Sequence, residues 1–169
     1  LEIPAGKGTR FRGVEQGGVR GALLRRGVAH EEEIVARRHG AHRRLAERLG
    51  YAASIRAALP DEAMASFAGV DDPFGAGRLP VGGRVVDLGS GGGFDCFVAA
   101  ELVGPTGSVV GVDMTPAMLE RSRRVANELG LRNVEFREGI LEAVPVADGW
   151  ADVVISNGVL NLVADKAQV

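Results

Sequence analysis

Hydrophobic and polar residues follow two different periods in the second half of the chain. Short apolar runs rich in valine predict four β-strands, at residues 84–88, 108–113, 133–137 and 151–156. Residues 94–103 and 115–130 instead place apolar side chains three and four positions apart, which predicts two helices. Strands that alternate with such helices predict an α/β fold with a parallel sheet. Right-handed crossovers then make it Rossmann-like and doubly wound.

The helix predicted over residues 115–130 has a signal at each end. Thr115 is a favourable N-cap, Pro116 suits the first helical position, and Gly130 stands just past the last apolar residue. The buried stripe expected on this helix consists of Met118, Leu119, Ser122, Val125, Ala126 and Leu129.

The first 75 residues lack this alternation. Residues 1–28 are rich in Gly and Arg without sustained periodicity, so we expect a disordered leader. Residues 29–75 predict a helical N-terminal segment followed by a linker, and Gly50 fits the C-terminal cap of a helix. Residues 76–169 then form the domain that contains the parallel sheet.

Length and composition narrow the class of protein. The chain has 169 residues, enough for one domain with a sizeable core. No apolar run approaches the ~20 residues of a membrane span, and the N-terminus lacks a signal-peptide pattern. The single cysteine, Cys96, excludes an internal disulfide and a cysteine-rich metal site. We therefore expect a cytoplasmic protein without a metal centre and without a membrane partner.

Charge is divided unevenly along the chain. Residues 1–60 hold 12 Lys+Arg and 6 Asp+Glu, whereas the rest is acidic and the whole chain has a net charge of −2. A basic leader can indicate nucleic-acid binding. This one lacks interleaved aromatic residues and any recognition motif, so no nucleic-acid partner is expected.

The stretch "VVDLGSGGGFD", from Val85 to Asp95, carries the chemistry of the first strand and the loop after it. Ligands bind at this position in open parallel sheets. The dinucleotide pattern G-x-G-x-x-G fits Gly89 and Gly91 but meets Phe94 at its last position. Asp87 would also repel a pyrophosphate. A carboxylate there suits a ligand with a positive amine, such as S-adenosylmethionine, although a nicotinamide oxidoreductase stays an alternative.

Two further acidic residues follow the next strands. Asp113 ends the second predicted strand, twenty residues after Gly93, where a carboxylate can accept hydrogen bonds from ribose hydroxyls. Glu142 lies after the third strand, where it can accept a hydrogen bond from an adenine amine. NAD and S-adenosylmethionine share the ribose contact of Asp113, so this residue does not distinguish the two. The three strand ends together make a more specific signal than the glycine loop alone.

Four segments carry a resemblance to a known family: "DLGSGGGFDCFVAA", "VGPTGSVVGVDMTPAML", "NVEFREGILEAVPV" and "ADVVISNGVLNLVADK". From Leu45 to Val169 the chain resembles class I S-adenosylmethionine-dependent methyltransferases, and more narrowly the arsenite methyltransferases. The resemblance implies S-adenosylmethionine as cofactor and a small-molecule methyl acceptor. The cofactor-binding residues that we expect are Asp87, Gly89, Ser90, Gly91, Gly93, Asp113, Met114, Leu141, Glu142 and Asn157.

The sequence departs from the arsenite-binding pattern of that family. Val70 and Gly158 stand at two positions where arsenic-methylating members have cysteines, and thiolates are the ligands that a soft centre needs. Cys96 is expected to pack in the core. The alternatives are a methyltransferase for another small metabolite or a non-catalytic cofactor-binding fragment, and no side chain stands out as catalytic.

The resemblance also implies a fold of seven strands. This chain supplies the first four, with the expected order 3-2-1-4, and is apparently truncated. The fourth strand is apolar almost throughout, which is typical of a strand buried on both faces. Its free edge would favour self-association through this strand.

Overall fold

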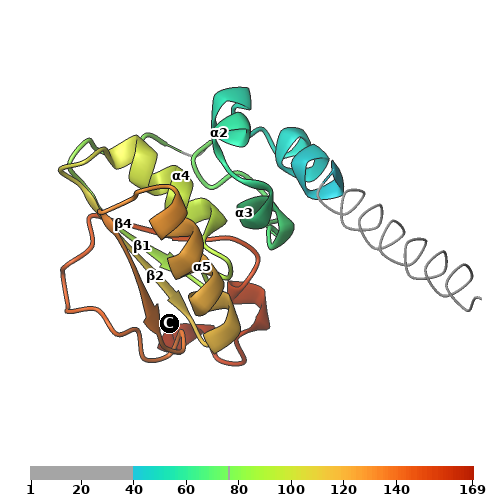
Figure 1. The fold of residues 1–169 in the computed structure, drawn as a ribbon. Helices are drawn as coiled ribbons and strands as arrows, with labels where there is room; N and C mark the ends of the chain where they lie inside the picture. Colours follow the sequence, from blue (N-terminus) through green and yellow to red (C-terminus); the bar gives the residue numbers. More distant parts are fainter. Residues whose placement is uncertain (1–39, 76) are drawn as a thin grey trace, which may run out of the picture. The chain divides into compact units, whose positions relative to one another are not determined.

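A computed structural model describes residues 40–75 and 77–169, which belong to a compact unit running from Arg37 to Val169. The predicted leader, residues 1–28, lies outside the described residues. Residues 40–48 are helical, and the elements that follow appear in Figure 1. They are α2 (Ala53–Ala58), α3 (Asp61–Ala65), β1 (Arg84–Leu88), α4 (Phe94–Val103), β2 (Ser108–Asp113), α5 (Pro116–Glu128), β3 (Val134–Glu138), β4 (Val153–Ser156) and the 3₁₀ helices η1 (Leu160–Leu162) and η2 (Lys166–Gln168).

The four strands form one parallel sheet with the order β3-β2-β1-β4, so the predicted fold class and strand order are confirmed. In the register, Asp87 of β1 lies between Gly111 of β2 and Ile155 of β4. Helices α4 and α5 pack on one face of the sheet (Figure 1). The opposite face is covered by the irregular connection between β3 and β4, through Leu141, Val144, Val146, Trp150 and Ala151.

Helix ends follow the residues that mark them in the sequence. Gly50 has φ +100°, and the Tyr51 amide bonds back to the Ala46 carbonyl, which closes the helix over residues 40–48. Pro116 occupies the start of α5, and Gly130 has φ +68° just after it. Of the stripe predicted on α5, Leu119, Ser122, Val125 and Ala126 are buried, whereas Met118 and Leu129 are half-buried.

The N-terminal helical segment shares its core with the sheet domain. Met64 and Phe67 are buried in the same cluster as Phe94 and Phe97 of α4. At the surface, Glu62 of α3 pairs with both Arg121 and Arg124 of α5. Residues on both sides of the predicted division at 75/76 therefore contribute to one hydrophobic core.

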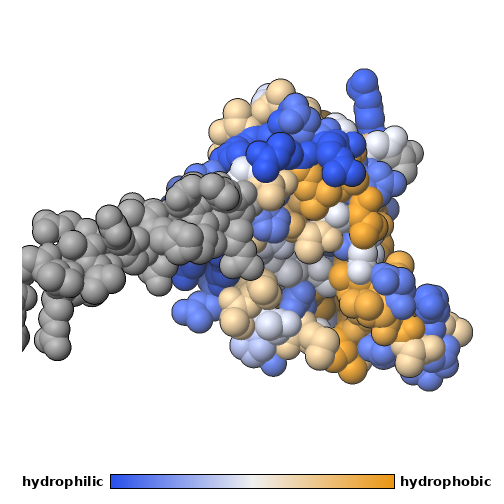
Figure 2. Space-filling model, turned by 90° about the vertical axis from the view of Figure 1, so that its right-hand side faces the viewer, coloured by the Kyte–Doolittle hydropathy of each residue, from blue (hydrophilic) through white to orange (hydrophobic). Residues whose placement is uncertain are grey.

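The fourth strand is less buried than its sequence suggested. Ile155 is buried, but Val154 is 58% exposed, so the expectation of burial on both faces is wrong for this strand. The reason is local, because the connection that covers Val86 and Leu88 on this face leaves Val154 open. Figure 2 shows hydrophobic residues reaching the surface in patches beside strongly hydrophilic ones. Within residues 40–75 and 77–169, no helix is both long and apolar enough to cross a membrane.

Candidate functional site

The carboxyl ends of the strands open onto two adjoining cavities. One has a volume of about 320 Å³ and lies over the glycine loop, with Asp87 and Asp113 in its lining. The other, about 430 Å³, lies beside the loop after β3. They share four lining residues, which are Gly89, Asp113, Val159 and Leu162. The arrangement is an elongated cleft at the position where parallel sheets bind nucleotide cofactors.

The glycine loop, residues 89–93, runs from β1 into α4 with left-handed backbone at three positions. Gly89, Gly91 and Gly93 have φ of +74°, +53° and +87°, which only glycine adopts at low cost. A Cβ on Gly93 would lie 2.7 Å from the Phe97 ring, so this glycine lets the loop pack on the core. A Cβ on Gly91 would meet no atom within 4 Å, because Gly91 faces the open cleft.

Asp87 lies at the base of the cleft and is only 2% exposed. The Cys96 thiol donates a hydrogen bond to its Oδ2 at 3.2 Å, which gives the predicted core cysteine a specific partner. Burial raises the pKa of Asp87 to about 8, and the neighbouring carboxylate of Asp95 adds to the rise. A buried carboxyl group without a cation beside it favours a positively charged ligand group.

Asp113 stands at the end of β2 and is tied to the loops on either side. Its Oδ2 accepts a hydrogen bond from the Gly91 amide at 2.8 Å, and its Oδ1 accepts one from the Thr115 amide at 2.8 Å. Each carboxylate oxygen can accept a second bond, so the group can still receive two hydroxyls. Two backbone amides thereby fix the carboxylate in the wall of the cleft.

The second cavity has a mainly apolar lining with two acids, Glu142 and the shared Asp113. Met114 is 70% exposed, and its neighbours in the lining include Leu141 and Glu142 from the loop after β3. Ile140, 49% exposed, belongs to the same lining. A flat aromatic ring suits such a surface, and Glu142 offers a hydrogen-bond acceptor at its edge.

Ser90 is buried in the glycine loop and lines the first cavity. Its Oγ has no hydrogen-bond partner among the described residues. A buried hydroxyl in this condition is costly unless a ligand or water satisfies it.

Sequence reasoning missed several residues that line the cleft from the segment after α3 and from the segment after β4. Ser66, Phe67 and Gly69 come from the segment after α3, while Val159 and Leu162 follow β4. The Val159 side chain lies directly over Gly89, 2.4 Å from where a Cβ would stand. No spacing in the sequence marks these residues, because only the tertiary fold brings them to the loop.

Asp95, the first acid of α4, forms a buried network with two distant residues. The Tyr51 hydroxyl donates to its Oδ1 at 2.5 Å, and the Asn157 amide donates to its Oδ2 at 3.0 Å. Burial raises the pKa of Asp95 to about 6, although these two hydrogen bonds oppose the rise. Burial also raises the pKa of Tyr51 well above its usual range, and the adjacent Asp95 carboxylate adds to this.

The positions Val70 and Gly158 lie next to each other at the mouth of the first cavity. A Cβ on Gly158 would be 3.4 Å from Cγ1 of Val70. Val70 is 69% exposed. The two residues that were predicted to stand in place of cysteines of the arsenite pattern therefore form one small, uncharged surface.

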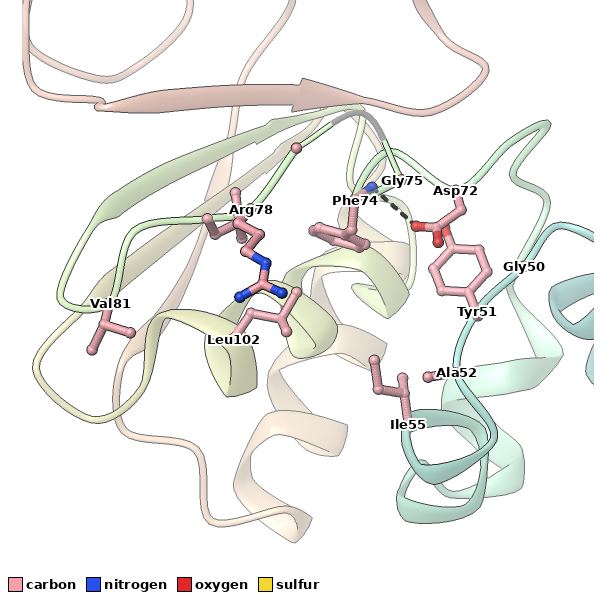
Figure 3. A pocket seen from close by; sticks show the side chains of 12 residues that line it. Gly50, Tyr51, Ala52, Ile55, Asp72, Phe74, Gly75, Arg78, Val81 and Leu102 are labelled. Atoms are coloured by element: carbon pink, nitrogen blue, oxygen red, sulfur yellow. Dashed lines mark hydrogen bonds between the residues drawn. The ribbon is translucent and has the colours of Figure 1, made fainter.

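A third cavity, of about 470 Å³, is separate from the glycine loop. Figure 3 shows Arg78, Val81 and Leu102 on one side of it and Tyr51, Ala52 and Ile55 on the other. The Phe74 amide donates to Oδ1 of Asp72 at 3.0 Å within its wall (Figure 3). Its lining contains none of the residues predicted to bind the cofactor.

The residues of the cleft fit S-adenosylmethionine on several independent grounds. The buried Asp87 suits the ammonium group of S-adenosylmethionine. The open side of Gly91 leaves room for the methionine moiety. The buried Ser90 hydroxyl, which also interacts with the Cys96 thiol, offers a polar contact in the same cavity. The oriented Asp113 carboxylate suits ribose, and the apolar second cavity suits adenine. The fold and this cleft define a Rossmann-like protein for a nucleoside cofactor with a positive charge.

Comparison with known proteins identifies the family. A family model described as a methyltransferase domain matches residues 80–169, more than half of the chain. The chain therefore belongs to the methyltransferase domain family, and its resemblance to arsenite methyltransferases is confirmed. The fold and cofactor of the family are those predicted from the sequence, a Rossmann-like sheet from the alternating strands and helices and S-adenosylmethionine from the first strand and its glycine loop.

Individual relatives support the same placement. An arsenite methyltransferase from Halobacterium salinarum is 47% identical over 123 residues, which is 73% of this chain and 31% of that protein. The human arsenite methyltransferase is 40% identical over 94 residues, or 50% of this chain and 25% of that protein. The crystal structure of an arsenic(III) S-adenosylmethionine methyltransferase from Chlamydomonas reinhardtii superposes with a TM-score of 0.59 at 41% identity, covering 68% of this chain and 42% of that one. The chain thus spans about a third or less of the length of the arsenite methyltransferases from Halobacterium salinarum and human.

Proposed function

We propose that this chain carries the cofactor site of an S-adenosylmethionine-dependent methyltransferase that acts on a small molecule. The observation that carries the proposal is the buried Asp87 carboxyl at the base of a glycine-lined cleft. In the glycine loop, Phe94 occupies the place of the third dinucleotide glycine, and the Asp87 carboxyl would disfavour a pyrophosphate. The location predicted from the sequence, the cytoplasm, stays a prediction.

Roles for the individual residues follow from where they line the cleft. Asp87 would pair with the amine of the methionine part, while Gly89, Ser90, Gly91 and Gly93 allow close approach of their backbone. Asp113 would accept the ribose hydroxyls. Met114 and Leu141 would pack on the adenine, and Glu142 would accept its amine.

When bound, S-adenosylmethionine supplies an electrophilic methyl group on a sulfonium. The work of this chain is then to hold the donor and to align it with the acceptor. A nucleophile that is soft or already anionic needs no strong general base, and no side chain at the cleft is assigned as one. The Val159 and Leu162 side chains, which lie across both cavities, would shield the donor from water.

The acceptor that we propose is a small metabolite other than arsenite. Arsenite is held by several thiolates at once, and Cys96 is the only cysteine of the chain. Cys96 is buried against Asp87, and burial raises the pKa of its thiol well above its usual range. The surface formed by Val70 and Gly158 offers no sulfur ligand and suits an apolar part of an acceptor.

The test is a methyl-transfer assay with the purified chain, which follows the demethylated cofactor by mass spectrometry. Arsenite, low-molecular-weight thiols and a set of carbon-acid metabolites serve as acceptors. We expect transfer to a compound other than arsenite. Transfer to arsenite alone would contradict the acceptor class. Cofactor binding without transfer to any compound would favour a non-catalytic cofactor-binding fragment.

We also propose that the chain self-associates through β4. Among the described strands, β4 pairs only with β1, and Val154 beside its free edge is largely exposed. An edge strand with exposed apolar side chains pairs readily with another chain.

A further inference from the structure

The side chain of Asn157 is hydrogen-bonded to the backbone of a distant loop. Its Oδ1 accepts hydrogen bonds from the Val70 amide at 2.8 Å and from the Asp71 amide at 3.3 Å. Its Nδ2 donates to the Asp71 carbonyl at 2.8 Å. Residues 68–72 are named here the rim loop. The Asn157 side chain pairs with backbone N–H and C=O groups of this loop, as the backbone of a neighbouring strand does.

Asp95 and Tyr51 hold this amide in its orientation. Nδ2 of Asn157 also donates to Oδ2 of Asp95 at 3.0 Å and approaches the Tyr51 hydroxyl at 3.2 Å. Because a carboxylate can only accept, Asp95 fixes which end of the amide faces it. The contacts use both hydrogens of the amide and both lone pairs of its oxygen, so no polar group of Asn157 is left for a ligand.

Gly69 lets the rim loop lie directly on this amide. A Cβ at Gly69 would be 2.4 Å from Nδ2 of Asn157 and 2.7 Å from the Phe67 ring. Its φ is not in the left-handed region, so only the lack of space at this position requires glycine. Gly77 offers a matched comparison, since it also lacks a left-handed φ and a Cβ there would meet nothing within 4 Å.

The rim loop is part of the cleft wall. Ala68 and Gly69 line the first cavity opposite the glycine loop, and Asn157 and Gly158 continue the same wall. Val70, at the centre of the loop, has an exposed side chain that adjoins Gly158, which lines the cavity. A group that fixes the backbone of Val70 therefore fixes an exposed side chain beside Gly158 of the cavity wall.

We propose that Asn157 is a positioning residue, which fixes the rim loop through its contacts with Val70 and Asp71 and so sets the place of Val70 on the acceptor side of the cleft. The role of the rim loop toward an acceptor rests on the proposed methyltransferase function. The hydrogen bonds of Asn157 with Val70 and Asp71, named here the clamp, do not depend on that function.

Hydrogen exchange of the Val70 and Asp71 amides, followed by NMR on the full chain, tests the clamp. Asn157→Ala and Gly69→Ala should each speed exchange of the Val70 amide about tenfold, the equivalent of one lost hydrogen bond. Gly77→Ala should leave it unchanged. In a chain that already carries Asn157→Ala, adding Gly69→Ala should change the rate by less than it does in the wild type, because only its contact with the Phe67 ring then remains.

Unchanged exchange at Val70 in Asn157→Ala, or full additivity of the two substitutions, would contradict the proposal that Asn157 fixes the rim loop.

Calorimetric titration with the demethylated cofactor tests whether the rim loop affects cofactor binding. We expect Gly69→Ala to bind it within about threefold of the wild type, and a methyl-acceptor assay of the same variant to show a raised KM with little change in kcat. Loss of cofactor binding with faster exchange would assign the loop to the cofactor instead. Wild-type chain that binds no cofactor would contradict the proposed function and leave the clamp intact.

Discussion

Gly91 and Gly93 belong to the same loop and both have a left-handed backbone, but their surroundings differ. Gly93 is enclosed by Phe97, Phe136 and Ser122, whereas Gly91 faces open space in the cleft. Gly93 is therefore needed for packing of the fold, whereas Gly91 leaves room for a ligand. A motif in the sequence cannot separate these two needs, because each depends on what packs against the loop.

This difference predicts opposite consequences for two similar substitutions. Gly93→Ala should lower the free energy of unfolding by about 2–5 kcal/mol, from backbone strain and overpacking together. Gly91→Ala should cost only about 1–2 kcal/mol of strain, but its methyl group would occupy the cleft and weaken cofactor binding. Urea denaturation and calorimetry measure the two effects. Gly149→Ala, with φ +68° and no atom within 4 Å of its Cβ, is the control for strain alone.

The carboxyl group of Asp87 predicts a pH dependence of cofactor affinity. Its pKa in the free protein is about 8, so the group is largely protonated at pH 6. An ammonium ligand pairs with the ionised form, and affinity should therefore rise between pH 6 and pH 8, by at most about tenfold per unit. Calorimetry at a series of pH values measures this. The rise should be absent in Asp87→Asn, and an equal slope in that variant would refute the assignment.

The same group has the opposite effect on the stability of the free chain. A carboxyl group whose folded-state pKa is raised favours folding while it is protonated. This contribution is full below about pH 4 and is lost as the pH rises through about 8. Loss of stability with rising pH and gain of affinity with rising pH thus have one origin.

At the scale of elements, α3 joins the N-terminal segment to the sheet domain. Met64, a residue of this helix, is fully buried. The ion pairs of Glu62 with Arg121 and Arg124 lie at the surface. Burial of an apolar side chain contributes more than a partly exposed ion pair. The attachment of α3 is therefore hydrophobic in origin.

Two substitutions on α3 separate these contributions. Met64→Ala should lower the free energy of unfolding by about 2–5 kcal/mol, whereas Glu62→Gln should cost at most about 1 kcal/mol. Denaturant unfolding of both variants measures the difference. Equal losses, or a larger loss for Glu62→Gln, would mean that the ion pairs hold α3 in place.

The elements of the sheet domain could be predicted from the sequence, and the packing of residues 40–75 could not. The strands β1 and β2 and the helix α5 show their periods and end signals locally, so their bounds were close to those observed. Tyr51 meets Asp95 across 44 residues, and Asn157 meets Tyr51 across 106. Such contacts leave no periodic trace in the sequence, and the role of Asn157 in the rim loop emerged only from the fold.

The predicted cofactor residues differ in how far the sequence could justify them. Asp87 and Asp113 lie near the carboxyl ends of β1 and β2, and the carboxyl ends of parallel strands share one edge of a sheet, so both were expected at the cleft. Leu141 and Glu142 lie in an irregular connection, whose course depends on packing against β1 and β2. Val159 and Leu162 were missed because nothing near them in the sequence indicates that they return to the glycine loop.

At the scale of the whole molecule, the exposed side of β4 predicts self-association. Light scattering after size-exclusion chromatography should show species larger than the monomer. Val154→Lys places a charge beside the free edge and should shift the distribution toward the monomer. Val81→Lys, at a site that is 83% exposed and outside the sheet, is the matched control and should not. A monomeric wild-type chain would contradict this prediction.

The central claim is that the cleft binds S-adenosylmethionine through Asp87 and Asp113 and does not bind NAD. Calorimetric titration of the chain with S-adenosylmethionine, its demethylated product and NAD tests it most directly. We predict one site for the first two ligands and no heat of binding for NAD. Asp113→Ala should weaken binding by about 1–3 kcal/mol through lost charge-assisted hydrogen bonds. NAD binding as tight as S-adenosylmethionine, or unchanged affinity in Asp113→Ala, would contradict the assignment of the site.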